Sequence, residues 1–306
     1  MPGQESFAKH FLLMTKNNDN NPAAASPITA EIQSALADRL AVVQAVLPKI
    51  EARLRELQSG DQGIQTKTND MDLVTRADLE SEALLKAAIS EKFPEDAILA
   101  EESGRSEGVG TAADFLWALD PVDGTINYAH GLPLYSVSIG ILWKNQPAAG
   151  LVSLPALGNR YRAIRGQGAT RDEQTIRVSD TSEISQALLV TGFPYNRHQM
   201  LPTLLAGVET ALKSVRGIRR TGSAAIDLCW LAEGRFDCYY EFNLNPWDTC
   251  AGTVILEEAG GAISQFRGEA YAQGDYQLAA SNGHLQAALL DVLAPIADAQ
   301  RLPPED

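Results

Sequence analysis

The chain has 306 residues, which is long enough for one large domain or two small ones with a substantial hydrophobic core. Hydrophobic residues make up 45% and charged residues 21%, and the formal net charge of −14 argues against non-specific binding to nucleic acids or anionic membranes. No apolar run reaches transmembrane length and nothing resembles a secretory signal. We therefore expect a cytoplasmic protein with no direct nucleic-acid partner and no membrane partner.

The first part of the chain predicts a disordered tail followed by helices. Residues 1–27 are polar and rich in Asn, Ala and Ser, which favours disorder. From residue 28 to 57 apolar residues recur at helical spacing, and Pro48 inside this pattern predicts a kink or a break into two helices. A second helix is expected from about residue 77 to 92.

Strand-like runs separated by glycine and proline follow, as is typical of antiparallel hairpins. They cover residues 97–100, 116–119, 137–143, 149–153 and 160–164. After that, strands at 187–191, 217–220, 238–241, 261–265 and 277–281 alternate with helices at 201–214, 223–232, 248–258 and 283–297. This order predicts a layered α/β sandwich. An N-terminal α+β half (28–180) and a C-terminal α/β half (181–298) would form one continuous domain.

The cysteines and histidines argue against a disulfide framework and a zinc site. Cys229, Cys238 and Cys250 are odd in number and have no C-x-x-C spacing, which indicates reduced and mostly buried thiols. The four histidines are scattered along the chain.

The segment 120–127 reads Asp-Pro-Val-Asp-Gly-Thr-Ile-Asn and is the most informative part of the sequence. The apolar run before it places Asp120 at or near a strand end, where Pro121 would stop the ladder and Gly124 would permit a tight turn. The groups facing the enclosed point would all carry oxygen: Asp120, Asp123, the Thr125 hydroxyl and the Val122 carbonyl. Such a site suits a hard cation such as Mg²⁺, and the alternative is an Asp-rich surface turn.

Two other acidic motifs have a functional and a structural interpretation. Glu101 and Glu102 close a strand-like run; they form a solvated acidic turn, or one of them points into the same pocket as Asp120 to bind metal and orient a water. Asp248 follows Trp247 at the start of an apolar helix, where it is the N-cap, a further metal ligand, or both.

Polar residues near two further helix starts are also ambiguous. Thr75 and Asp78 fit a capping box, but Asp78 could also accept a hydrogen bond from Thr125. Lys67 is either a surface lysine or a phosphate contact.

The segment Gly222-Ser223-Ala224 opens a helix whose free N–H groups suit an oxyanion, or it is simply a close-packed helix start. Glu241 could bind sugar-like hydroxyls or be a plain strand-end acid.

Together these motifs resemble the inositol monophosphatase family of Mg²⁺-dependent, lithium-sensitive phosphatases. The family signatures D-P-x-D-G-T-x-N and W-D-x-x-A-G stand at 120–127 and 247–252, and Glu-Glu-Ser at 101–103 and the element from Asp72 to Asp78 also match. The resemblance covers about residues 28–297. It implies an αβαβα sandwich of the inositol monophosphatase and fructose-1,6-bisphosphatase type, two or three Mg²⁺ ions per active site, and a homodimer.

The resemblance also implies a role for each matched residue. The metal ligands would be Glu101, Asp120, Asp123, Asp248 and the Val122 carbonyl. The attacking water would be oriented by Glu101 and Thr125, with Asp78 behind Thr125. The substrate would contact Gly124, Thr125, Gly222, Ser223, Ala224 and Glu241. A flexible loop carrying Lys67 and Asp72 would complete the site.

The implied reaction is hydrolysis of a small phosphomonoester, with inositol 1-phosphate as the best single choice. Segments 192–198 and 243–246 differ between branches of the family, so histidinol phosphate and fructose 1,6-bisphosphate remain alternative substrates. A regulatory role as a partner of another macromolecule is a further alternative, because some bacterial relatives are implicated in RNA-polymerase-associated complexes. A two-carboxylate glycoside hydrolase would explain two acids but not five beside a Gly-Thr turn.

Overall fold

The computed structural model describes residues 28–60, 62–67, 73–109 and 113–301. The predicted disordered tail, residues 1–27, lies outside these residues. The first helix, α2 (Ala30–Gln58), is capped by the Thr29 hydroxyl and buries one apolar stripe along its whole length. The break predicted at Pro48 is wrong, because α2 continues through this residue. Leu47 and Ile50, on either side of Pro48, are both fully buried, so packing outweighs the lost hydrogen bond.

The second helix, α3 (Arg76–Lys92), begins in the predicted capping box. The Ala77 N–H donates to the Thr75 hydroxyl at 3.1 Å, and the Thr75 N–H donates to the Asp78 carboxylate at 2.8 Å. The box satisfies two of the free N–H groups at the helix start and confirms that interpretation of Thr75 and Asp78.

The larger sheet has eight strands in the order β10-β9-β8-β7-β6-β5-β3-β4. Their bounds are β3 Ala97–Ala100, β4 Gly104–Ser106, β5 Phe115–Asp123, β6 Ser136–Trp143, β7 Gln146–Leu154, β8 Asn159–Ile164, β9 Ala169–Arg171 and β10 Gln174–Thr175. The predicted antiparallel pattern is wrong at one place, because β3 and β5 run parallel. Strand β4 forms a hairpin on the outer side of β3, so the chain returns to the inner side in the same direction as β3.

The smaller sheet has five strands in the order β12-β11-β13-β15-β14. Its strands are β11 Leu188–Thr191, β12 Gly217–Arg219, β13 Cys238–Phe242, β14 Ala262–Ser264 and β15 Gln277–Ser281. The helices of this half are α5 Leu201–Ser214, α6 Ala224–Ala232, α7 Pro246–Glu258 and α8 Gln286–Leu293. The predicted helix at 283–297 is shorter than expected, because a 3-10 turn at Ala294–Ile296, which contains a proline, follows α8. Short elements complete the chain: β1 Gln65–Thr66, β2 Leu73–Val74, α4 Thr125–Ala129 and a 3-10 turn at Ile184–Gln186.

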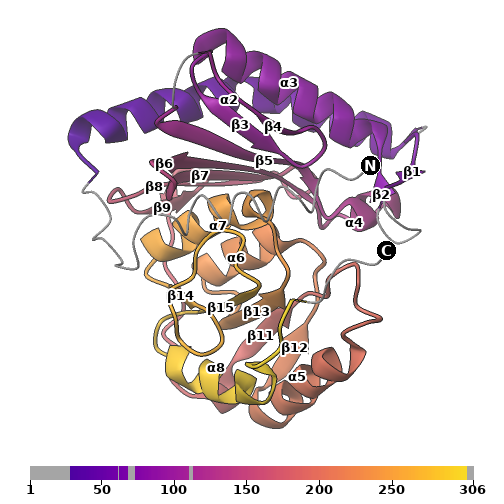
Figure 1. Cartoon of the computed structure of the whole chain (residues 1–306), viewed down its shortest axis with the longest axis vertical. Coiled ribbons are helices and arrows are strands. Elements are labelled where there is room, and N and C mark those ends of the chain that lie inside the picture. Colours follow the sequence, from indigo (N-terminus) through magenta and orange to yellow (C-terminus); the bar gives the residue numbers. More distant parts are fainter. Residues whose placement is uncertain (1–27, 61, 68–72, 110–112, 302–306) are drawn as a thin grey trace.

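The elements stack in five layers (Figure 1). Helices α2 and α3 cover one face of the larger sheet, α6 and α7 lie between the two sheets, and α5 and α8 cover the far face of the smaller sheet. One buried apolar cluster joins α2 and α3 to the larger sheet, a second extends from the larger sheet through α6 and α7 to the smaller sheet, and a third joins the smaller sheet to α5 and α8. The αβαβα sandwich expected from the resemblance is therefore confirmed.

Helix α7 lies directly against the backbone of the larger sheet. A Cβ atom at Gly140 would lie 2.5 Å from the Cys250 sulfur, and one at Gly150 would lie 2.4 Å from the Ala251 carbonyl oxygen. Only glycine permits this approach. All three cysteines are free and buried, as predicted.

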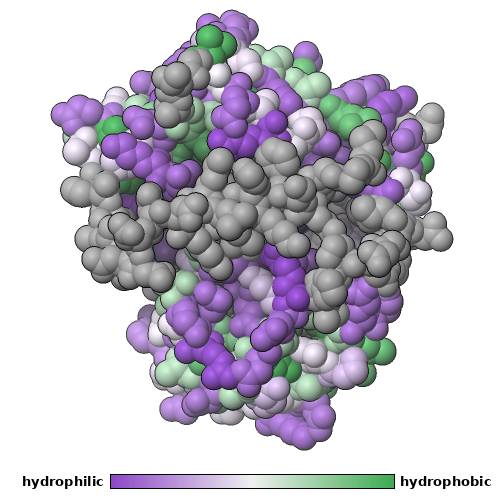
Figure 2. Space-filling model, in the orientation of Figure 1, coloured by the Kyte–Doolittle hydropathy of each residue, from purple (hydrophilic) through white to green (hydrophobic). Residues whose placement is uncertain are grey.

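The described part of the face in Figure 2 is largely hydrophilic, with small scattered apolar areas. Within the described residues, no helix is both long and apolar enough to span a lipid bilayer.

Candidate active site

Strand β5 carries the central acidic pair through an irregularity. The strand was expected to stop at Pro121, but it continues to Asp123. Asp120 pairs with Ser138 and Asp123 with Ser136, so three steps along β5 match two steps along β6. This bulge accommodates Pro121, which has no N–H to contribute to a ladder. Proline therefore breaks the register without ending the strand.

The turn behind this strand is as tight as the sequence predicts. Gly124 has a φ of 93°, and helix α4 begins at the next residue. A Cβ at Gly124 would lie 2.9 Å from the Leu134 carbonyl oxygen, so both conformation and space call for glycine. The Thr125 hydroxyl donates to the Val122 carbonyl at 2.9 Å and lies 3.3 Å from an Asp78 carboxylate oxygen. The turn thus brings Val122, Thr125 and Asp78 together.

The parallel pairing of β3 with β5 places Glu101 beside Asp120. Ala100 pairs with Leu119, and the Glu101 N–H donates to the Leu119 carbonyl at 3.0 Å. Asp120 is buried and accepts the Val122 N–H at 3.0 Å. The solvated acidic turn considered for 101–102 is therefore wrong, because Glu101 and Glu102 are only partly exposed and Glu101 adjoins the buried Asp120.

Asp123 and Asp248 reach the same region from two other layers. The Asp123 carboxylate accepts the Ser223 hydroxyl at 2.6 Å and the Ala225 N–H at 2.8 Å, which connects β5 to the start of α6. Asp248 lies at the third position of α7, where it accepts the Asn245 N–H at 2.7 Å. The N-cap of α7 is Asn245, so the N-cap interpretation of Asp248 is wrong, although Asp248 does complete the capping box.

The electrostatics of these carboxylates favour the binding of a cation. Burial, followed by the charges of Glu101, Asp123 and Asp248, raises the pKa of Asp120 well above its ordinary value. Burial and then Glu101 likewise raise the pKa of Asp248, and burial raises the pKa of Asp123 to about 6. These acids oppose one another's ionisation in a buried setting, and a bound cation would favour the ionised forms.

The oxygen donors fit a hard cation that keeps much of its water. Within the described residues, no group of three or more His, Cys, Asp or Glu side chains is arranged to hold a metal ion by itself. An ion here would need carbonyl oxygen and water in addition to carboxylates, which is how Mg²⁺ is usually held in proteins. The Val122 carbonyl, which already accepts the Thr125 hydroxyl, is one such oxygen.

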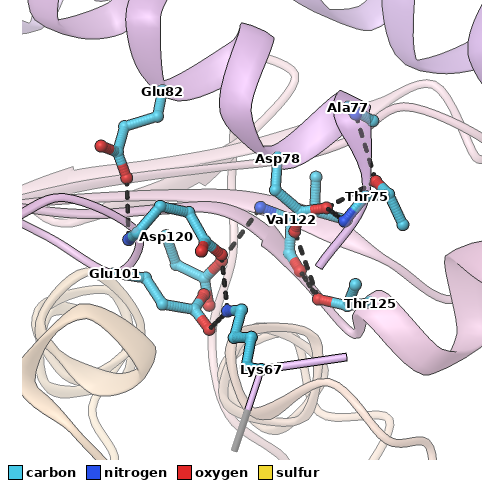
Figure 3. A network of polar contacts seen from close by, with 10 residues as sticks. Lys67, Thr75, Ala77, Asp78, Glu82, Glu101, Asp120, Val122 and Thr125 are labelled. Carbon is cyan, nitrogen blue, oxygen red and sulfur yellow. Dashed lines mark hydrogen bonds and ion pairs between the residues drawn. The ribbon is translucent and has the colours of Figure 1, made fainter. Parts of the chain in front are cut away.

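Lys67 contacts both Glu101 and Glu102, and Figure 3 shows it beside Glu101. Its ammonium is 2.8 Å from a Glu101 oxygen and 2.6 Å from a Glu102 oxygen, and its side chain is only 12% exposed, so a surface lysine is excluded. Burial lowers the pKa of Lys67, but the two glutamates outweigh burial and the net pKa lies above the ordinary value. Burial, then Glu101, raises the pKa of Glu102 to about 8. Asp72, predicted on the same loop, lies outside the described residues.

The expected substrate side begins at α6. Ser223 is the N-cap of this helix, and Gly222 before it has a φ of 90°. Glu241 lies in β13 and accepts the Tyr239 hydroxyl at 2.7 Å, and burial raises its pKa to about 7. A Cβ at Gly192 would lie 2.1 Å from a Glu241 carboxylate oxygen, so Glu241 lies directly against the backbone after β11.

The sequence pattern of the inositol monophosphatase family matches residues 33–298. The chain belongs to this family. The inositol-1-monophosphatase of Synechocystis is 42% identical over 233 residues, which are 76% of this chain and 80% of that protein. The Nus factor SuhB of Pseudomonas aeruginosa is 38% identical over 226 residues, 73% of this chain and 83% of that protein. The structure of an inositol monophosphatase from Anabaena has 37% identity and a TM-score of 0.76, covering 85% of this chain and 97% of that chain.

Membership of the inositol monophosphatase family makes the protein a phosphatase that hydrolyses phosphomonoesters. The fold of its solved relatives agrees with the five layers described above. The individual roles of the matched residues stay predictions.

Two residues of the site were missed in the sequence. Ser136, whose hydroxyl lies 3.4 Å from the Asp123 carboxylate, follows from the register of β6 and had no local signal. Glu82, which accepts the Glu102 N–H at 2.9 Å, lies four residues after Asp78 on α3. Helical spacing could have indicated Glu82, because residues four apart share one helix face.

Proposed function

We propose that this inositol monophosphatase family member is a Mg²⁺-dependent phosphomonoesterase acting on a small polyol phosphate. The observation that carries the proposal is that Glu101, Asp123 and Asp248 lie close enough to the buried Asp120 for their charges to raise the pKa of Asp120, and that Glu101 and Asp123 likewise raise the pKa of Asp248. Such an arrangement disfavours the folded protein unless a cation offsets it. A divalent cation with open positions for phosphate oxygen is the natural occupant.

Glu101, Asp120, Asp123, Asp248 and the Val122 carbonyl would hold two or three Mg²⁺ ions. Bound Mg²⁺ supplies positive charge to polarise the phosphate and to offset charge on the leaving alkoxide. The Glu101 carboxylate and the Thr125 hydroxyl would orient the attacking water on the side opposite the leaving group. Asp78, 3.3 Å from the Thr125 hydroxyl, would hold that hydroxyl in place. The contribution of the protein is mainly positioning and charge, which is what a loose phosphoryl-transfer transition state requires.

The substrate would lie between the turn after β5 and the start of α6. The Gly124 and Thr125 amides would bind phosphate oxygens, and Gly222, Ser223 and Ala224 would line the alcohol side. Glu241 would accept hydrogen bonds from substrate hydroxyls, since its carboxylate already accepts one from the Tyr239 hydroxyl. Lys67 and Asp72 would belong to the loop that completes the site.

Inositol 1-phosphate is the best single candidate substrate, because the acidic alcohol side suits a neutral polyol. The similarity to the Synechocystis inositol-1-monophosphatase supports this choice. Histidinol phosphate and fructose 1,6-bisphosphate are the alternatives on the same fold.

The experiment is phosphate release, with and without Mg²⁺, from inositol 1-phosphate, histidinol phosphate, fructose 1,6-bisphosphate, NADP and adenosine 3′,5′-bisphosphate. We expect Mg²⁺-dependent turnover of inositol 1-phosphate far above the other compounds, and inhibition by lithium, at about millimolar concentration, through displacement of a Mg²⁺ ion. Selective turnover of another compound would change the proposed substrate but leave the proposed active site unchanged. No turnover of any compound by the folded protein would contradict the proposal.

A second candidate function is a role as a Nus factor, favoured by the 38% identity to the Pseudomonas aeruginosa protein of that name. This role can coexist with catalysis, and a catalytically inactive variant that still restores a transcription phenotype would support it.

We also propose that residues 28–298 fold as one domain and that the protein is a cytoplasmic homodimer. Light scattering of the purified chain should then give twice the monomer mass.

A further inference from the structure

Helix α3 presents one polar face to the site, made up of Asp78, Glu82 and Lys86, which are spaced four apart. Figure 3 shows Asp78 and Glu82 on this helix. Asp78 contacts the hydroxyls of Thr75 and Thr125 at 2.5 and 3.3 Å. Glu82 accepts the Glu102 N–H at 2.9 Å, and Lys86 donates to the Ser103 hydroxyl at 2.6 Å. One helix face therefore touches both the turn that carries Thr125 and the turn that carries Glu101.

The Glu82 contact completes the support of the Glu101 main chain. The Glu101 N–H donates to Leu119 of β5, and the next N–H, that of Glu102, donates to Glu82. Both amides that flank the Cα atom of Glu101 are thus held, one by the sheet and one by the helix. The backbone reverses direction at residues 101–103, between Ala100 of β3 and its partner Gly104 of β4, so no regular ladder holds Glu102.

Burial of a glutamate at position 82 costs free energy, and the hydrogen bond that it accepts from the Glu102 N–H offsets this cost. Glu82 is buried and lies next to a turn that already carries Glu101 and Glu102. The buried residues that follow it on α3, Leu85 and Ile89, are apolar, so packing against them does not by itself require a carboxylate. The position needs a side-chain oxygen with the reach to accept the Glu102 N–H, and an apolar residue cannot supply one.

We propose that Glu82 is a positioning residue for Glu101. Asp78 holds Thr125, Glu82 holds the main chain of Glu101, and the four-residue step from Asp78 to Glu82 spans about 6 Å along a rigid helix. One turn of α3 would thus set the separation of the two groups that orient the attacking water. The role in catalysis rests on the proposed function, whereas the role in holding the turn does not.

The test compares three substitutions at one position. Glu82→Gln keeps an oxygen acceptor of the same reach, Glu82→Asp keeps the charge but shortens the reach, and Glu82→Leu removes the acceptor. Glu80 on the same helix gives the matched control, since its ion-pair partners are Arg53 of α2 at 2.7 Å and Arg76 at 3.5 Å. Glu80→Leu removes an ion pair from α3 without touching the turn at 101–103.

The first readout is hydrogen exchange of the Glu102 amide in the full-length metal-free protein. We expect exchange at least about tenfold faster in Glu82→Leu and Glu82→Asp, and near wild type in Glu82→Gln and Glu80→Leu. Equal exchange in Glu82→Leu and wild type would overturn the proposal. Faster exchange in Glu82→Gln than in Glu82→Asp would also overturn it, because charge rather than reach would then matter.

The second readout is steady-state kinetics with inositol 1-phosphate and a Mg²⁺ titration. We expect kcat about tenfold lower and the Mg²⁺ concentration for half-maximal rate higher in Glu82→Leu and Glu82→Asp, with KM little changed and Glu82→Gln near wild type. Altered exchange with unchanged kcat would overturn the positioning role. If the wild type hydrolyses no phosphomonoester, the proposed function fails, while hydrogen exchange and Mg²⁺ calorimetry on the same variants still decide the role of Glu82.

Discussion

Two buried aspartates in the N-terminal half, Asp96 and Asp120, differ sharply in the partners that surround their carboxylates. They are similarly inaccessible, with 5% and 2% exposure. Asp96 accepts two hydrogen bonds from the Arg39 guanidinium, each 2.8 Å, and a third from the Trp117 indole at 2.8 Å. Asp120 accepts one backbone N–H and faces other acids.

The charges around the two aspartates differ as much as their hydrogen-bond donors do. The Arg39 guanidinium lies 3.6 Å from the Phe115 ring centroid and 4.4 Å from that of Phe93, so the ion pair with Asp96 is enclosed by aromatic rings and saturated with donors. The pKa of Asp120, in contrast, is raised by burial and by neighbouring carboxylates. A buried carboxylate therefore does not by itself indicate a functional site. A buried carboxylate without a compensating positive charge does.

The largest effect is expected from Asp120→Asn. The amide keeps the oxygen that accepts the Val122 N–H but removes a negative charge, so the fold should persist while cation binding is lost. We expect kcat to fall by roughly a thousandfold or more, with an unchanged or higher melting temperature in the metal-free protein. Phosphate release and thermal unfolding measure both, and wild-type turnover would remove Asp120 from the site.

Breaking the compensated pair should give the opposite profile. Arg39→Met leaves Asp96 buried with the Trp117 indole as its remaining side-chain donor, which should cost about 3–5 kcal/mol of the free energy of unfolding. Urea unfolding measures this loss, and kcat of the folded fraction should not change. Arg53→Met is the control, because its partly exposed pairs with Glu56 and Glu80 each contribute about 1 kcal/mol or less. Equal losses in both variants would contradict the comparison.

Uncompensated acids should also make stability depend on pH. The folded-state pKa values of Asp78 and Glu241, about 6 and about 7, lie above the values near 4 of the unfolded chain. The metal-free folded protein therefore binds more protons than the unfolded one between about pH 4 and pH 7, and its stability should fall as the pH rises through this range. The free energy of unfolding should fall by up to about 1.4 kcal/mol for each unit of pKa shift, and by less where water reaches the carboxylate.

Unfolding of the chelator-treated protein at pH 5 and pH 8 tests this expectation. Added Mg²⁺ should raise the melting temperature more at pH 8, where the carboxylates are ionised, than at pH 5. Metal-free stability that rises from pH 5 to pH 8 would show that these acids are compensated after all.

The smallest effect is expected from Thr125→Ala. The substitution removes a hydroxyl that contacts Val122 and Asp78 but leaves the acidic cluster intact. We expect kcat to fall about tenfold to a hundredfold with little change in KM, and Thr125→Ser to retain most of the activity. An equal loss in the Ser and Ala variants would exclude a role for the hydroxyl.

Several elements of this protein could be predicted because they depend on near neighbours in the chain. The capping box of Thr75 and Asp78, the helical stripe of α2 and the glycine turn at Gly124 all involve residues at most a few positions apart. Local backbone preference and hydrophobic periodicity determine such features. The acidic motifs were recognisable for the same reason, since each is a short run of residues.

Local patterns in the chain thus determine the helices, most strands and the identity of the acids, but not how the acids meet. Only the folded molecule shows three further features. Helix α2 continues through Pro48, β3 runs parallel to β5, and Asp123 accepts a hydrogen bond from Ser223, 100 residues away. Helix breaking, strand direction and side-chain partners at such separations depend on competing long-range packing, which no local pattern records. Whether a buried carboxylate is paired, as at Asp96, or left facing other acids, as at Asp120, is decided by the same long-range contacts.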